Sequence, residues 1–126
     1  MKILVVDDEK DVQILFQQRF RKEIRSKEFA FLFAFSGEEA LQKLKELGHE
    51  TVLILSDINM PGMSGLELLK HIKQEFNQPP PTVMMITAYG DEHNFTTAKN
   101  LGADEFLTKP LDFKLLKEKL KTQRYE

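Results

Sequence analysis

The chain has 126 residues and a formal net charge of −2, with 18 lysines and arginines against 20 acidic residues, and it contains no cysteine. This length suits a single domain over residues 1–126, and the near balance of charge gives no positive field to attract nucleic acid. Disulfide and thiolate chemistry are excluded. No apolar run is long enough for a signal peptide or a membrane span, so we expect a cytoplasmic domain without a membrane partner.

The N-terminal residues predict a strand followed by a helix. Residues 3–6 are branched aliphatics followed by the acidic residues Asp7 and Asp8, a pattern typical of a strand and its end. From residue 10 the apolar side chains recur four apart and predict one amphipathic helix. Its apolar stripe is Val12, Phe16, Phe20 and Ile24. The basic residues of this stretch, spaced by Glu23, fit a solvated helix face, and they are Arg19, Arg21, Lys22, Arg25 and Lys27.

A second strand is predicted over residues 29–35, FAFLFAF, where four phenylalanines share one face at period two. Two interpretations stay open for it. Either helices cover the strand, or some rings are exposed on an edge strand and mark a contact surface. Ser36 and Glu39 form a capping-box pattern that begins the next helix, and Gly48 ends that helix.

In residues 52–65 an apolar run is followed by an aspartate and then by residues typical of a turn. Residues 52–57 predict a strand buried on both faces, with Asp57 at its end. A proline and two glycines between residues 59 and 65 predict a tight loop beside Asp57. Ser64, three residues before Glu67, then caps an amphipathic helix.

The C-terminal third continues the alternation. Residues 82–87 predict a strand that ends at Thr87, and residues 91–101 predict a helix of poor helix formers, a candidate for movement. Residues 104–108 form a short strand before Lys109, and Asp112 begins a last amphipathic helix. Five strands alternating with five helices predict an α/β fold, with a parallel sheet, right-handed crossovers and helices on both faces.

Polar residues end four of the predicted strands: Asp7 with Asp8, Asp57, Thr87 and Lys109. The carboxyl ends of parallel strands form one crevice, so these side chains should converge. Three convergent carboxylates repel one another unless a cation discharges them, and Mg²⁺ prefers such oxygen ligands. A carboxylate beside a metal, a lysine and a hydroxyl can serve as a nucleophile in phosphoryl transfer. The simpler alternative is that the first two acids only cap the following helix.

Four motifs occur in the order VVDDE, LSDINMPGMSG, MITA and FLTKP. Over residues 2–122 the chain resembles the response-regulator receiver domains of the CheY-like family in two-component signalling. The resemblance implies a flavodoxin-like (β/α)5 fold, a doubly wound five-stranded parallel sheet with strand order 2-1-3-4-5. It also implies that Asp57 accepts a phosphoryl group from a sensor histidine kinase or a phosphotransfer protein.

The resemblance assigns roles to the other residues of the crevice. Asp8, Asp57 and the backbone carbonyl of Asn59 would hold Mg²⁺, with Asp7 acting mainly through a metal-bound water. Lys109 would pair with a phosphoryl oxygen, and its peptide bond to Pro110 is expected to be cis.

The resemblance also predicts a switch. Thr87 would swing to hydrogen-bond the phosphoryl group, and Phe106 would turn inward to fill the vacated space. The output surface would be the face formed by the helix at 91–101, the strand at 104–108 and the last helix, including Tyr89, Phe95 and Lys114. This face would contact an effector domain or a target protein, or form a homodimer. For Phe95 a core role and a contact role stay equally open.

The resemblance implies a regulatory domain that assists its own phosphorylation and dephosphorylation, and two other classes of function are the alternatives. A phosphatase of the haloacid dehalogenase type needs a second aspartate two residues after the nucleophile, where this chain has Asn59. An interaction module that works without phosphorylation usually lacks one of the crevice residues, and here all are present. The last helix has no clear stop signal, so a free-standing domain and the front of a longer protein both stay open.

Overall fold

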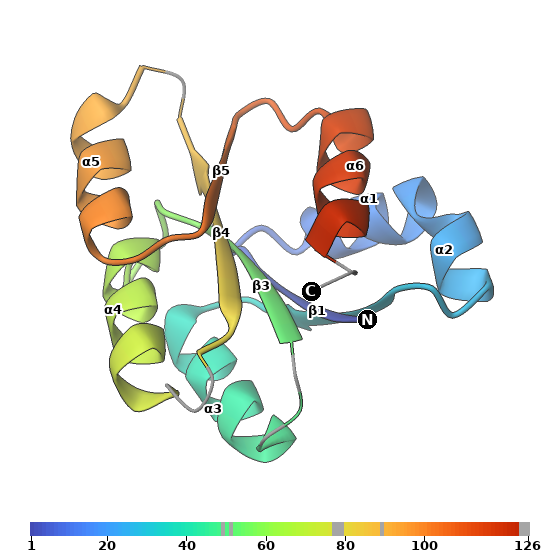
Figure 1. Cartoon of the computed structure of the whole chain (residues 1–126), viewed down its shortest axis with the longest axis horizontal. Coiled ribbons are helices and arrows are strands. Elements are labelled where there is room, and N and C mark those ends of the chain that lie inside the picture. Colours follow the sequence, from blue (N-terminus) through green and yellow to red (C-terminus); the bar gives the residue numbers. More distant parts are fainter. Residues whose placement is uncertain (49, 51, 77–79, 89, 124–126) are drawn as a thin grey trace.

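The computed structural model describes residues 1–48, 50, 52–76, 80–88 and 90–123 (Figure 1). Its five strands are β1 (Lys2–Val6), β2 (Ala30–Ala34), β3 (Val52–Asp57), β4 (Thr82–Thr87) and β5 (Glu105–Thr108). They pair in parallel in the order β2-β1-β3-β4-β5. The predicted doubly wound parallel sheet and its strand order are confirmed.

The described helices are α1 (Asp11–Arg19), α2 (Arg21–Arg25), α3 (Gly37–Leu47), α4 (Gly65–Glu75), α5 (Glu92–Asn100) and α6 (Phe113–Gln123). Helices α3, α4 and α5 cover one face of the sheet, and α1, α2 and α6 cover the other (Figure 1). Strand side chains alternate between the two resulting cores: Leu4 packs with the first group of helices and Val5 with the second. The three inner strands, β1, β3 and β4, are therefore buried on both faces.

The helix predicted from residue 10 is two helices, because the backbone leaves helical geometry at Phe20, where φ is −109° and ψ is 24°. Apolar residues four apart advance about 40° per step around a helix of 3.6 residues per turn. A straight helix therefore cannot turn the whole predicted stripe toward the sheet. The break lets Phe16 and Phe20 both reach 0% exposure, while Ile24 stays 36% exposed. The prediction that Ile24 faces inward was wrong.

Glu23 is the second correction, because it is buried rather than solvated. Its carboxylate lies 3.0 Å from Lys117 Nζ on α6, and its other oxygen, Oε1, has no hydrogen-bond partner among the described residues. Burial alone would raise the pKa of Glu23, but the hydrogen bond and charge of Lys117 lower it overall.

Strand β2 combines both interpretations of its phenylalanines. It is an edge strand, and Phe29 is fully buried while Phe31 and Phe33 are half-buried. The rings of Phe31 and Phe33 meet that of Phe16 on α1 edge-on, with centroids 5.6 and 6.3 Å apart. The helices therefore cover the strand only in part.

Three predicted helix starts are confirmed by side-chain caps. Ser36 accepts a hydrogen bond from the Glu39 amide at 3.0 Å, and Ser64 accepts one from the Glu67 amide at 3.2 Å. Asp91 caps α5 in the same way. No helix in the described part of the chain combines the length and the apolar character needed to cross a bilayer.

Candidate functional site

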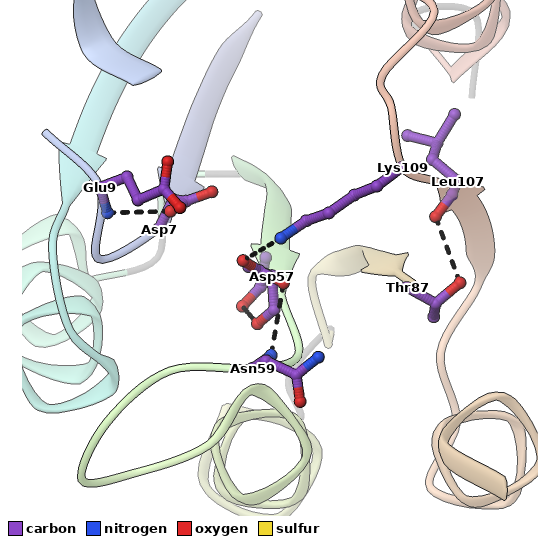
Figure 2. Close-up of polar contacts among 8 residues, drawn as sticks. Asp7, Glu9, Asp57, Asn59, Thr87, Leu107 and Lys109 are labelled. Carbon is purple, nitrogen blue, oxygen red and sulfur yellow. Dashed lines mark hydrogen bonds and ion pairs between the residues drawn. The ribbon is translucent and has the colours of Figure 1, made fainter. Parts of the chain in front are cut away.

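Asp57 ends β3, the middle strand of the sheet, and is only 3% exposed. The Asn59 amide donates a hydrogen bond to its Oδ1 at 3.3 Å, and Lys109 Nζ donates one to its Oδ2 at 2.8 Å (Figure 2). Both carboxylate oxygens are therefore oriented by groups that lie beyond strand ends.

The loop after Asp57 is held against the strand by Gly65. The Gly65 amide donates a hydrogen bond to the Ile58 carbonyl at 2.7 Å. A Cβ atom at Gly65 would lie 2.1 Å from the carbonyl oxygen of Asp57 and 2.7 Å from Ile58 Cα, which no side chain tolerates. The predicted tight turn is confirmed, and its glycine fixes how closely α4 begins beside the aspartate.

Asp57 belongs to a cluster of three carboxylates with Asp7 and Asp8, whose oxygens lie within 4.8 Å of one another. Asp7 is buried and Asp8 is exposed, and the Glu9 amide donates a hydrogen bond to Asp7 Oδ1 at 2.9 Å. Burial raises the pKa of Asp7, and the charges of Asp57 and Asp8 raise it further against the opposing effects of the Glu9 amide and Lys109. The predicted convergence of the three acids is confirmed.

Lys109 supplies positive charge at this cluster. Burial alone would lower its pKa, but the hydrogen bond and charge of Asp57 raise it overall, with help from Asp7 and Glu9. The lysine backbone is fixed by its amide, which donates to the Thr87 carbonyl at 2.9 Å, and its peptide bond to Pro110 is cis, as predicted. One ammonium therefore faces three carboxylates, and the site carries excess negative charge.

The predicted switch residues Thr87 and Phe106 make their printed side-chain contacts with groups outside the acidic cluster. Thr87 is buried, and its hydroxyl is 3.5 Å from the Leu107 carbonyl on β5, on the side away from Asp57 (Figure 2). The Phe106 ring packs on that of Phe95, with centroids 4.3 Å apart. Phe95 is 41% exposed, so it combines the two roles left open for it. Tyr89 lies outside the described residues.

The donor set fits a hard divalent cation. All its side-chain ligands are carboxylate oxygens, two of the three acids are buried, and a single lysine leaves their charge uncompensated. The explanation that the first two acids only cap a helix does not account for Asp7, whose carboxylate approaches Asp57.

Several backbone groups of the site were not foreseen, among them the Asn59 amide that holds Asp57, the Glu9 amide that holds Asp7 and the Leu107 carbonyl that holds Thr87. Every residue has such groups, so no side-chain pattern could have singled them out.

A comparison with protein-family models matches residues 3–121 to the response regulator receiver domain. Response regulator RppA of Synechocystis is 34% identical over 110 residues, which cover 87% of this chain and 44% of RppA. The transcriptional regulatory protein ResD of Bacillus subtilis is 35% identical over 109 residues, covering 86% of this chain and 42% of ResD. The chain thus spans less than half the length of these curated relatives. The solved structure of Vibrio cholerae chemotaxis protein CheY4 covers 96% of each chain at 26% identity, with a TM-score of 0.79.

Proposed function

The chain belongs to the response regulator receiver domain family of two-component signalling, and we propose that Asp57 is its phosphoacceptor and that residues 1–126 form one receiver domain. Domains of this family are regulatory rather than classical enzymes. The observation that carries the proposal is a buried Asp57 carboxylate paired with Lys109 at 2.8 Å and faced by two further acids.

In the proposed reaction an Asp57 carboxylate oxygen attacks the phosphorus of a phosphohistidine. The new bond joins that oxygen to phosphorus, the bond from phosphorus to the histidine nitrogen breaks, and the electron pair leaves with the nitrogen. Lys109 is already within hydrogen-bond distance of Asp57 Oδ2, so a small movement brings its ammonium to a phosphoryl oxygen. The Asn59 amide holds the other carboxylate oxygen in position.

Asp7, Asp8, Asp57 and the backbone carbonyl of Asn59 would hold Mg²⁺, with Asp7 acting mainly through a bound water. Bound there, Mg²⁺ would neutralise charge on the incoming phosphoryl group. The fit of the site rests on three carboxylates whose oxygens lie within 4.8 Å of one another. Burial raises the pKa of Asp7, and the charges of Asp57 and Asp8 raise it further. Lys109 cannot discharge that cluster alone, because it pairs with Asp57 and leaves the other two acids facing each other.

Phosphorylation of Asp57 would increase the negative charge of the site, and this added charge would drive the switch. Thr87 would exchange its 3.5 Å contact with the Leu107 carbonyl for a hydrogen bond to the phosphoryl group. Its rotation would free space for Phe106, which would leave the Phe95 ring and turn inward. The α5–β5–α6 face, which carries the exposed Phe95, would change shape as a result.

The partners follow from this role. A sensor histidine kinase or a phosphotransfer protein would donate the phosphoryl group. The curated relatives, a response regulator and a transcriptional regulatory protein, are more than twice as long as the matched segment. An effector domain or a separate target protein would read the α5–β5–α6 face, and the same face could form a homodimer.

The test is phosphorylation by acetyl phosphate in the presence of Mg²⁺, followed by intact mass and peptide mapping. We expect one phosphoryl group, labile to hydroxylamine as an acyl phosphate is, on Asp57. Asp57→Asn should abolish it, whereas Asp104→Asn, which changes a carboxylate paired with Lys73 away from the cluster, should retain it. Beryllofluoride with Mg²⁺ should shift the amide resonances of Thr87 and Phe106. No modification, or modification that survives Asp57→Asn, would favour a module that works without phosphorylation.

A further inference from the structure

A groove of about 380 Å³ lies between the edge strand β2 and helices α1 and α2. It is lined by Gln17, Arg21, Ile24, Arg25, Phe31 and Phe33. The two half-buried phenylalanine rings and the exposed Ile24 make its apolar part, and the two arginines supply its charge. None of these residues belongs to the phosphoacceptor site, so the proposed phosphorylation leaves the groove unexplained.

One side of the β2 backbone beside this groove pairs with no other described strand. Ala30 donates its amide to the Met1 carbonyl, and Ala34 accepts from the Asp7 amide, so alternate residues of β2 face β1. The intervening Phe31 and Phe33 therefore direct their amides and carbonyls to the open edge. No other described strand pairs with that edge. An exposed apolar edge strand is a ready template for one more strand.

The groove also carries positive charge from two arginines. Arg21 and Arg25 are exposed, and neither makes an ion pair with any residue that the structure describes. Arg19, by contrast, lies over the Phe113 ring. Two guanidinium groups that have no ion-pair partner among the described residues, beside apolar rings, suit carboxylates that flank an apolar side chain.

From these three features we propose that β2 and its groove bind an extended acidic peptide segment of a partner protein. The segment adds as a strand along Phe31 and Phe33, places an apolar side chain between their rings and Ile24, and offers carboxylates to Arg21 and Arg25. A second copy of this chain fits less well, because its β2 edge would bring the same two arginines against the first pair. Nucleic acid would satisfy the charge but not the main-chain groups of the edge.

The experiment uses the whole chain and a short fluorescein-labelled peptide in which glutamate alternates with valine around a central phenylalanine. Fluorescence anisotropy should show saturable binding. Arg21→Glu combined with Arg25→Glu should weaken it at least about tenfold, since each lost contact becomes a repulsion. The matched control is Lys22→Glu with Lys27→Glu, which makes the same change in charge on residues that do not line the groove, and it should retain most of the affinity. Circular dichroism would confirm that both variants are folded.

The strand geometry is tested separately by hydrogen exchange, in which the peptide should slow exchange of the Phe31 and Phe33 amides. A peptide N-methylated on the amides of one edge should lose binding that its isomer methylated on the other edge retains. Absence of saturable binding, or equal loss in both pairs of variants, would overturn the proposal. So would sedimentation showing that the chain pairs with itself through β2, or tighter binding of single-stranded DNA than of the peptide. None of these results depends on Asp57, so they test the groove independently of the phosphoacceptor proposal.

Discussion

Replacing Asp57 by asparagine should stabilise the protein when no divalent cation is present. The substitution removes one of three carboxylates whose oxygens lie within 4.8 Å of one another. At an effective dielectric constant of about 20, two unit charges at that distance repel by roughly 3.5 kcal/mol. Asp7 is buried and feels most of this repulsion, whereas Asp8 is exposed and feels much less.

The same substitution also removes the ion pair with Lys109. That lysine side chain is 43% exposed, so water can solvate its ammonium when the partner is lost, and the pair contributes only about 1 kcal/mol. The asparagine oxygen can still accept from the Asn59 amide. The net effect should be an increase of about 1–3 kcal/mol in the free energy of unfolding.

Urea denaturation in EDTA, with and without added Mg²⁺, measures both parts of this prediction. Asp57→Asn should raise the unfolding midpoint in EDTA without changing the m-value, and it should lose most of the stabilisation that Mg²⁺ gives the parent chain. Asp104→Asn is the control of opposite sign, because Asp104 pairs with Lys73 and accepts from the Val83 amide. A less stable Asp57→Asn in EDTA would refute the reasoning that repulsion dominates this site.

Three further predictions concern the parts that support the site. Gly65→Ala should cost at least about 2–4 kcal/mol in urea unfolding, because its Cβ would meet backbone atoms of Asp57 and Ile58, and it should also reduce labelling by acetyl phosphate. Gly37→Ala, whose Cβ would have side-chain atoms of Met63 rather than backbone as its three nearest neighbours, should cost less, and an equal cost would contradict the steric explanation. Lys117→Met should cost about 2–3 kcal/mol by leaving the buried Glu23 carboxylate unpaired, whereas Lys119→Met, which opens a more exposed pair with Glu105, should cost about 1 kcal/mol or less. Because the folded-state pKa of Glu23 is lowered, the stability from its ionised form is present above the ordinary glutamate pKa of about 4.3 and is lost as pH falls through the folded value. The stability difference between the parent chain and Glu23→Gln should therefore shrink in acid, and a difference that grows there would contradict the assigned sign.

The sequence allowed the sheet and the acidic cluster to be predicted because both depend on short-range patterns. Branched aliphatic runs marked the strands, and the residue after each run marked its end. The carboxyl ends of parallel strands lie at one edge of the sheet. The sequence alone therefore predicted that Asp7, Asp57 and Lys109 lie close together. The motifs of the receiver family then fixed the strand order.

The sequence did not reveal the break at Phe20 or the burial of Glu23. Both depend on how α1 and α2 fit the sheet and α6, which is a long-range packing outcome. A glutamate among five basic residues looks solvated until Lys117, 94 residues later, is placed beside it. The side-chain orientations of Thr87 and Phe106 could likewise not be predicted from the sequence, because they depend on contacts with β5 and α5.

The pairing of Asp57 with Lys109 joins residues 52 positions apart, and Asp7 comes from the opposite end of the chain. The acidic cluster needs β1 and β3 side by side, and its lysine needs the loop beyond β5. A nascent chain that has made only its first strands therefore carries no competent acceptor. If Asp57 is the acceptor, a kinase can phosphorylate only molecules in which these strands are assembled. Phosphorylation would then also report that the domain has folded.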